Sequence, residues 1–280
     1  MAAAAMMTRP IPSSGEAMPV IGLGTSQVFD VGADAPARAG PRAAVIALVA
    51  GGGRMIDTSP MYGPAEAVTG DLVAELGVRP QIFLATKVWT SGREEGIAQM
   101  RRSAALLRSP VLDLIQIHNL LDWRTHLQTL RRMKEAGQVR HIGITHYTVG
   151  SLAELARILD SEPGIDFVQC AYSLGTRDAE TRLLPVAAAR GVAVIVNRPF
   201  ENGGMVHRVR GRTLPEWAGA FDCTSWAQLF LKYILAEPAV TCVIPATANP
   251  SHMTDDINSA LGRLPDAAQR EQIRRLWDRL

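Results

Sequence analysis

Short apolar runs alternate with longer segments of helical periodicity along almost the whole chain. Most of these runs are continuous rather than alternating, which is typical of parallel strands that are covered on both faces. We expect strands at Val20–Leu23, Met55–Asp57, Ile82–Lys87, Leu112–Ile117, His141–Thr145, Phe167–Cys170, Val192–Asn197 and Val240–Ile244. Between them we expect helices at Ala43–Ala50, Ala65–Leu76, Ile97–Leu107, Arg124–Ala136, Leu152–Leu159, Glu180–Ala189 and Thr224–Leu235. This alternation predicts an α/β fold built on a parallel sheet.

The number of strands favours a closed (β/α)8 barrel, the TIM barrel, over an open doubly wound sheet. An open sheet that binds a dinucleotide would carry a glycine-rich turn before its first helix, and residues 22–25 lack the third glycine and the helix. Single barrels of this kind commonly have about 250 residues, so the chain of 280 residues fits one domain. We predict a barrel over residues 18–280, an N-terminal extension over residues 1–17 and an additional C-terminal helix over Pro265–Leu280.

Several residues mark where helices begin and end. Gly77, Gly137 and Gly191 follow helical segments, as C-terminal capping glycines do. Ser151 comes directly before a helical segment, with Glu154 three positions on, which predicts a capping box.

The composition is that of a globular protein and excludes several kinds of partner. Hydrophobic residues make up 47% and charged residues 20% of the chain, which indicates a sizeable core. The net charge of +2 is too small to indicate a nucleic-acid partner. Cys170, Cys223 and Cys242 form no CxxC pair, so we expect neither a disulfide framework nor a metal site. No apolar run approaches the roughly 20 residues of a membrane-spanning helix, so we expect no membrane partner.

The first residues bear on where the protein is located. Met1–Met7 are apolar but lack a basic leader and are too short for a signal sequence. We therefore expect a cytoplasmic protein. A periplasmic location stays open if an export signal has been removed from the N-terminus.

Four polar residues stand at or just beyond the ends of predicted strands in the first half of the chain. They are Asp57, Tyr62, Lys87 and His118. If these strands belong to one barrel, the four side chains gather at its carboxyl end, where barrel enzymes have their active sites. The charge of Lys87, at the end of an apolar strand, needs a partner, and Asp57 is the natural candidate. For this pair alone, a purely structural ion pair is an equal alternative.

The phenol of Tyr62 favours a catalytic interpretation of the cluster. An unperturbed tyrosine has a pKa of about 10 and is a poor acid at neutral pH. A neighbouring ammonium favours the phenolate and lowers this pKa, which turns Tyr62 into a proton donor. His118 can then donate a hydrogen bond that orients a substrate carbonyl. Trp89, two positions after Lys87, is a candidate apolar wall of the pocket, with ordinary core packing as the alternative.

Four motifs at the strand ends resemble those of the aldo-keto reductase family. They are residues 55–63 (MIDTSPMYG), 85–89 (ATKVW), 112–118 (LDLIQIH) and 141–147 (HIGITHY). The resemblance runs from about Val20 to Ala260, in order and with spacing similar to that of the family. It implies a (β/α)8 barrel that binds NADPH in an extended conformation, without a Rossmann domain.

The resemblance also implies a role for each residue of the cluster. Tyr62 would be the general acid, Lys87 would lower its pKa, and Asp57 would pair with Lys87. His118 would orient the substrate carbonyl, and Tyr62, Trp89 and His118 would contact the substrate. The implied reaction is reduction of an aldehyde or ketone to an alcohol. A hydride passes from the nicotinamide to the carbonyl carbon while Tyr62 protonates the developing alkoxide.

The coenzyme positions follow from the same resemblance. Thr145 and His146 occupy the positions of the pair that holds the carboxamide, with Gln169 beside them, and Asn197 occupies that of an aromatic residue stacked on the nicotinamide. The other implied coenzyme contacts are Gly24, Thr25, Ser26, Asp57, Arg198, Pro199, Phe200, Asn202, Thr247, His252 and Asp256. Several of these begin the long polar segment Pro199–Asp222, and loops of that length inside a compact domain are usually functional.

Four positions depart from the family pattern. His146 replaces an asparagine, and Asn197 removes an aromatic face worth about 1 kcal/mol. His252 replaces an arginine and cannot bind a phosphate in a bidentate way, and the acidic Asp256 replaces an asparagine and disfavours a dianion. NADPH is the expected coenzyme, and NADH stays open.

Two other functions stay open from the residues. One is a barrel lyase in which Lys87 forms a Schiff base. The other is a barrel without catalytic activity that binds a nucleotide and acts as a sensor or subunit. The resemblance favours a reductase with an open pocket for small carbonyl substrates, and a monomer is the expectation that the family implies.

Overall fold

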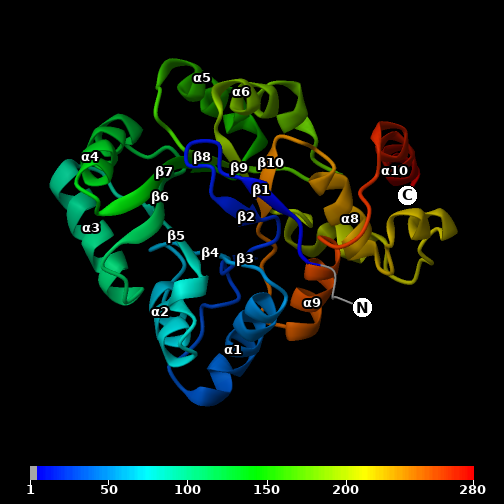
Figure 1. The fold of residues 1–280 in the computed structure, drawn as a ribbon, viewed down its shortest axis with the longest axis horizontal. Helices are drawn as coiled ribbons and strands as arrows, with labels where there is room; N and C mark the ends of the chain where they lie inside the picture. The colour runs from blue at the N-terminus through cyan, green and yellow to red at the C-terminus, as the bar shows by residue number, and fades with distance from the viewer. Residues whose placement is uncertain (1–4) are drawn as a thin grey trace.

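The chain folds as a closed barrel of eight parallel strands, and the computed structural model describes residues 5–280 of it (Figure 1). The strands, in the order in which they neighbour one another, are β3 (Leu23–Gly24), β4 (Met55–Asp57), β5 (Phe83–Val88), β6 (Leu112–His118), β7 (Val139–His146), β8 (Phe167–Ala171), β9 (Ala193–Asn197) and β10 (Val240–Val243). Bridges from Ile21 to Val243 and from Gly24 to Ala246 join the first strand to the last. Each predicted strand overlaps an observed one, and the predicted (β/α)8 fold is confirmed.

Helices surround the barrel on its outer face (Figure 1). Those between successive strands are α1 (Ala35–Ala50), α2 (Ala65–Glu75), α3 (Arg93–Leu106), α4 (Trp123–Glu135), α5 (Leu152–Ser161), α6 (Leu183–Arg190), α7 (Gly204–Arg208) and α8 (Trp226–Leu235), and after the last strand come α9 (Pro250–Asn258) and α10 (Ala267–Arg279). Short 3₁₀ turns lie at Arg79–Gln81, Val149–Ser151, Asp178–Thr181, Glu201–Gly203 and Glu216–Phe221. α1 begins well before the predicted Ala43, because Asp34 caps it by accepting the N–H of Ala37 at 2.9 Å.

The predicted capping box at Ser151 is wrong although α5 begins at Leu152 as predicted, and the three predicted capping glycines are confirmed. The side chain of Ser151 makes no capping bond with α5, because the backbone before this helix already forms a 3₁₀ turn. Gly77, Gly137 and Gly191 have φ values of 66°, 69° and 63°. This left-handed conformation is the one that ends a helix and that glycine adopts without strain.

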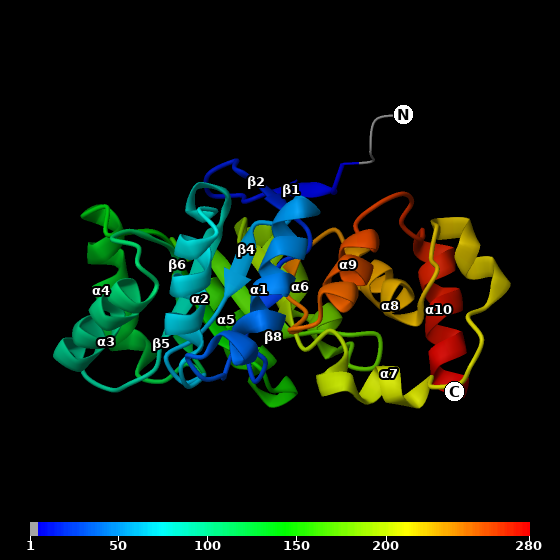
Figure 2. The ribbon, with the colours of Figure 1, turned by 90° about the horizontal axis from the view of Figure 1, so that it is seen from below.

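A β-hairpin covers the amino-terminal end of the barrel. Its strands β1 (Thr8–Pro10) and β2 (Ala17–Pro19) pair antiparallel, and Figure 2 shows them at the end opposite α7. Ile11 and Met18 are fully buried and belong to the apolar cluster inside the barrel. The hairpin therefore forms the floor of the barrel. The boundary between an extension over residues 1–17 and the barrel stays a prediction, and residues 1–4 lie outside the described residues.

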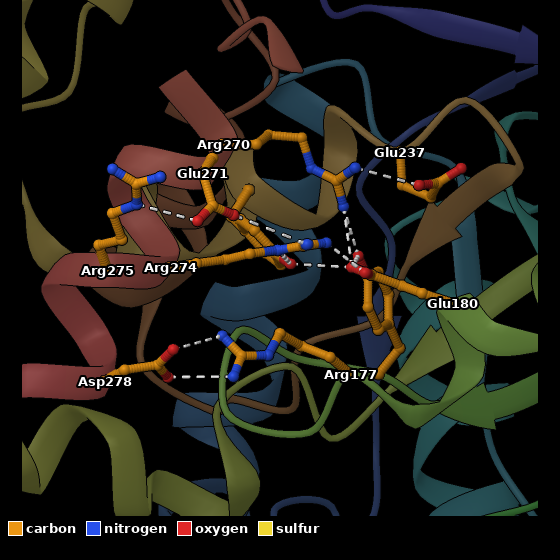
Figure 3. A network of polar contacts seen from close by, with 10 residues as sticks. Arg177, Glu180, Glu237, Arg270, Glu271, Arg274, Arg275 and Asp278 are labelled. Atoms are coloured by element: carbon orange, nitrogen blue, oxygen red, sulfur yellow. Dashed lines mark hydrogen bonds and ion pairs between the residues drawn. The ribbon is translucent and has the colours of Figure 1, made fainter. Parts of the chain in front are cut away.

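The predicted additional helix is α10, which lies beside α8 at the side of the barrel (Figures 1 and 2). A capping box between Asp266 and Gln269 starts it. Arg270 and Arg274 extend from it to Glu180, which lies just before α6, as Figure 3 shows. Over residues 5–280, no helix combines the length and the apolar character that crossing a membrane requires.

Candidate active site

The side chains that fill the barrel alternate along each strand, and this alternation brings the polar residues to the carboxyl end. In β5, Ala85 lies in the interior cluster, so Lys87 shares its face. In β6, Leu114 lies in the same cluster, so Gln116 and His118 follow it on that face. Apolar residues therefore pack the lower barrel, and polar residues surround its mouth, where active sites of such barrels lie.

Lys87 and Asp57 form a buried ion pair at this end. Lys87 Nζ lies 2.6 Å from Asp57 Oδ2 and donates to the carbonyl oxygen of Thr58 at 2.7 Å. Burial has the largest single effect and would lower the pKa of Lys87, but Asp57 and Tyr62 together outweigh it, so the pKa is raised and the amine is charged. The structure thus brings the two predicted partners together. A charged amine argues against Schiff-base chemistry, which needs a neutral lysine.

Two glutamines complete the hydrogen bonding of Asp57. Its Oδ1 accepts from Gln116 Nε2 at 2.9 Å and from Gln169 Nε2 at 3.0 Å. Gln169 is one of the predicted site residues, whereas the sequence reasoning missed Gln116. The signal that could have found Gln116 is its place in an apolar strand, two positions before His118 and therefore on the same face.

Tyr62 lies next to this ion pair. Lys87 Nζ is 5.1 Å from the centre of the phenol ring, and the backbone N–H of Tyr62 donates to the carbonyl oxygen of Ser59 at 3.0 Å. Burial raises the pKa of Tyr62, the charge of Lys87 lowers it, and the net result is a raised pKa. The predicted net lowering is wrong for this structure, because the cost of desolvating a phenolate outweighs the attraction of the ammonium. The phenol is protonated at neutral pH and has a proton to donate.

His118 lies beside Tyr62 and is neutral. The two ring centres are 5.8 Å apart in an edge-to-face arrangement, and His118 Nδ1 is 3.0 Å from Ser59 Oγ. Burial and the charge of Lys87 lower the pKa of His118 to about 3. Trp89 has its ring centre 6.5 Å from that of His118 and is 40% exposed. A substrate bound at His118 would contact Trp89. The position of Trp89 is therefore compatible with its predicted role as an apolar wall, and that role stays a prediction.

The three predicted coenzyme residues at β3 lie beside the strand that carries Asp57. The N–H and the hydroxyl of Thr25 both donate to the carbonyl oxygen of Asp57, at 3.1 and 3.0 Å. A Cβ on Gly24 would lie 2.9 Å from the carbonyl oxygen of Ile244, so only glycine allows this close approach. Ser26 is half-buried at the end of this segment.

Thr145 and Asn197 extend the polar network that begins at Asp57. Both donate to Gln169 Oε1, at 3.2 Å each. Asn197 Oδ1 is buried and has no hydrogen-bond partner among residues 5–280. An unpaired buried acceptor costs about 1–3 kcal/mol, so an N–H donor of a ligand fits this position. His146 is half-buried, and its Nδ1 accepts the N–H of Thr148 at 3.2 Å.

A cavity of about 310 Å³ lies between the segments that follow β7, β8 and β9. Its lining residues are Tyr147, Thr148, Val149, Ala171, Tyr172, Thr176, Arg198, Glu201 and Asn202. The guanidinium of Arg198 stacks over Tyr147, 4.2 Å from the ring centre. Arg198, Glu201 and Asn202 all have positive φ, between 51° and 55°, and such strained backbone concentrates at ligand sites. Pro199 is buried and Phe200 half-buried in the same loop.

The last predicted coenzyme residues lie at and before α9. Thr247 Oγ1 accepts the N–H of Asn249 at 3.0 Å, and His252 is exposed on the helix. Asp256 is buried, and burial together with Asp255 raises its pKa well above the ordinary value. The neutral form of Asp256 is therefore favoured. A neutral carboxyl group repels a phosphate less than the charged Asp256 that we expected from the sequence.

Comparison with known sequences identifies one family, the aldo/keto reductases. The model of the aldo/keto reductase family matches residues 20–278 of the chain. A methylglyoxal reductase of Escherichia coli (strain K12) is 28% identical over 262 residues, which cover 89% of this chain and 88% of that protein. An aldo-keto reductase of Mycobacterium avium (strain 104) is 31% identical over 248 residues, which cover 86% of this chain and 80% of that protein.

Solved structures share the same fold. A crystal structure of an aldo-keto reductase from Klebsiella pneumoniae in complex with NADPH matches with a TM-score of 0.81 at 23% identity and covers 97% of this chain and 96% of that chain. A second Klebsiella pneumoniae structure, in complex with NADP and acetate, matches with a TM-score of 0.78 at 24% identity, over 94% of this chain and 93% of that chain. At this level of sequence identity, the structural similarity establishes the barrel fold alone.

Proposed function

Because the chain belongs to the aldo/keto reductase family, it is an NAD(P)H-dependent oxidoreductase that reduces carbonyl groups, and we propose that Tyr62 is the acid of this reaction. One observation carries the proposal. Lys87 Nζ lies 2.6 Å from Asp57 Oδ2 and 5.1 Å from the centre of the Tyr62 ring. The centre of the His118 ring lies 5.8 Å from that of Tyr62. The alternative of a barrel without catalytic activity is not supported, because the similar proteins are reductases.

NADPH is the proposed coenzyme, with NADH as the alternative. The unpaired Asn197 Oδ1 and the polar chain through Gln169 and Thr145 support a position for the nicotinamide amide there. The positive charge of Arg198 and the loop through Asn202 support a place for the phosphates in the adjoining cavity. When bound, the coenzyme supplies the hydride ion that the reduction needs.

The residues of this chain handle the proton and the developing charge. As the carbonyl carbon gains the hydride, the carbonyl oxygen takes the proton of Tyr62, which leaves a phenolate. The charge of Lys87 stabilises that phenolate, and Asp57 keeps Lys87 charged. His118 is neutral and can donate an N–H to the same oxygen. The phenolate regains a proton from water once the alcohol has left.

Replacing Tyr62 by phenylalanine tests the proposal. Tyr62→Phe keeps the ring and removes the acidic proton, so we expect coenzyme binding to persist while turnover falls about 10²- to 10⁴-fold, the usual contribution of a general acid. Coenzyme fluorescence measures the binding, and NADPH oxidation with a reactive aldehyde such as a nitrobenzaldehyde measures turnover. Equal turnover in the variant and the parent would remove the phenol from the mechanism.

Substrate class, assembly and location complete the proposal. We propose small aldehydes and ketones as substrates, in line with the name of the similar Escherichia coli methylglyoxal reductase. We also propose a cytoplasmic monomer that has no nucleic-acid partner, in line with the small net charge of +2. Side-by-side equilibrium titrations with NADPH and NADH, followed by a panel of carbonyl compounds with the preferred coenzyme, decide the coenzyme and narrow the substrate.

A further inference from the structure

Ser59 is a buried residue in the turn after β4 that has no role in the proposed function. Its side chain is fully buried. Its carbonyl oxygen accepts the N–H of Tyr62 at 3.0 Å, and its hydroxyl oxygen lies 3.0 Å from His118 Nδ1. One residue therefore bonds to both groups that act on the substrate oxygen in the proposed reaction.

The direction of the hydrogen bond between Ser59 and His118 follows from counting protons. Ser59 Oγ already accepts the N–H of Met61 at 3.3 Å, and a serine hydroxyl has one proton to donate. In the part of the chain that the structure describes, His118 Nδ1 is the acceptor within reach of that proton. If Nδ1 were the donor instead, the buried hydroxyl would lose its acceptor, and an unmade buried hydrogen bond is unfavourable. The hydroxyl therefore donates and Nδ1 accepts.

This hydrogen bond decides which nitrogen of His118 carries the proton. A neutral imidazole has one N–H, so a ring whose Nδ1 accepts must carry its proton on Nε2. Burial and the charge of Lys87 lower the pKa of His118 to about 3, so the ring is neutral near neutral pH. Within residues 5–280, Nδ1 is the ring nitrogen that has a protein partner, which leaves the N–H of Nε2 for a ligand.

We propose that Ser59 is a positioning residue that holds His118 in the tautomer with its proton on Nε2, ready to donate to the oxygen of a carbonyl substrate. The opposite tautomer would present a lone pair to that oxygen and repel it. The role of the Nε2 proton in turnover rests on the proposed function, whereas the tautomer itself does not depend on it.

Two variants of Ser59 and one control test the proposal. Ser59→Ala removes the hydroxyl, and Ser59→Cys keeps a group of similar shape but donates only weakly. Thr69→Val is the control, because Thr69 on α2 has a buried hydroxyl without a partner in the described residues. The ¹⁵N resonances of the His118 ring report the tautomer in the full-length protein. Turnover of a reactive aldehyde and a coenzyme titration are measured on the same samples.

The expected result separates a hydrogen bond from simple packing. We expect the parent and Thr69→Val to show a single tautomer protonated on Nε2. Ser59→Ala and Ser59→Cys should both show a mixture of tautomers and a fall in kcat/KM of about tenfold, the size of one hydrogen bond of ordinary strength, with coenzyme affinity unchanged.

Three results would overturn the proposal. The first is a single Nε2 tautomer in Ser59→Ala with unchanged kcat/KM. The second is wild-type behaviour of Ser59→Cys, which would mean that only the volume of the side chain matters. The third is a parent ring protonated on Nδ1. If the parent protein turns over no carbonyl compound, the proposed function fails, yet the ring resonances still decide the role of Ser59.

Discussion

At the scale of single residues, stability and chemistry depend on the same ion pair. Lys87 is fully buried, and its charge is compensated by Asp57 at 2.6 Å and by the carbonyl oxygen of Thr58. Asp57 is in turn held by the amide groups of Gln116 and Gln169. Because both charged groups of the pair have hydrogen-bond partners besides each other, the cost of burying the charges is offset as long as these partners are present.

Breaking the pair from one side should therefore be costly. Lys87→Met leaves the Asp57 carboxylate buried without its cation, and we expect a loss of about 3–5 kcal/mol in the free energy of unfolding. The double variant Lys87→Met with Asp57→Asn should recover much of this loss, because a neutral amide can still accept from Gln116 and Gln169. Denaturant unfolding measures both. A double variant no more stable than the single one would contradict the explanation.

At the scale of elements, the alternation of side chains along parallel strands assembles the site. The helix α10, outside the barrel, stabilises the segment after β8, which lies next to the site. Tyr172 follows β8 and lines the cavity, and its hydroxyl donates to Glu180 at 2.5 Å. Glu180 also accepts from Tyr233 of α8 and pairs with Arg270 and Arg274 of α10 (Figure 3). α10 is thus joined by polar contacts to a wall of the cavity.

The charge of Glu180 should stabilise the protein in a way that depends on pH. Burial raises the pKa of Glu180, but hydrogen bonds from Tyr172 and Tyr233 and the charges of Arg274 and Arg270 outweigh it and hold the pKa below 4.5. A lowered carboxyl pKa adds stability above the pKa of the unfolded chain, and this stability is lost as pH falls through the folded pKa. We expect Glu180→Gln to lower the free energy of unfolding by about 1.5–3 kcal/mol near neutral pH. The difference in stability between the variant and the parent protein should disappear in acid.

Urea unfolding of Glu180→Gln and the parent protein at several pH values checks this. Glu271→Gln is the matched control, because Glu271 lies on α10 and is 47% exposed. We expect it to change the free energy of unfolding by no more than about 0.5 kcal/mol. A loss in Glu180→Gln that persists unchanged in acid would show that the carboxylate charge is not its cause.

At the scale of the whole molecule, the two ends of the barrel serve different purposes. Figure 2 shows the β1–β2 hairpin at one end of the barrel, and its Ile11 and Met18 pack in the interior. Asp57 and Lys87 lie at the other end, where β4 and β5 finish. Stability at the floor and chemistry at the mouth are therefore separable, as in other barrels of this type.

Truncation of a floor residue should reveal this separation. Met18 is fully buried, so Met18→Ala leaves a cavity and we expect a loss of about 2–5 kcal/mol in the free energy of unfolding. Coenzyme affinity should stay unchanged under conditions where the protein is folded. Ile46→Ala is the control, because Ile46 is 43% exposed on α1. A coenzyme affinity that fell together with stability would show that the two ends are coupled.

The sequence predicted the order and kind of the elements well, because strand length, helical period and capping glycines are local properties. It failed where a local signal competes with the neighbouring backbone. Ser151 has the sequence of a capping box, but a 3₁₀ turn already precedes α5. Gln116 was missed because an amide in a strand has no chemical signature until its partner Asp57 is known.

What the sequence by itself determined is that three polar side chains meet at the mouth. Asp57, Lys87 and His118 end neighbouring parallel strands, and the ends of such strands coincide in space. The tertiary structure alone decided what these groups do to one another. The pKa of Tyr62 rises rather than falls because burial is a property of the whole fold. The partner of the His118 ring is Ser59, a residue 59 positions away that only folding brings within hydrogen-bonding distance.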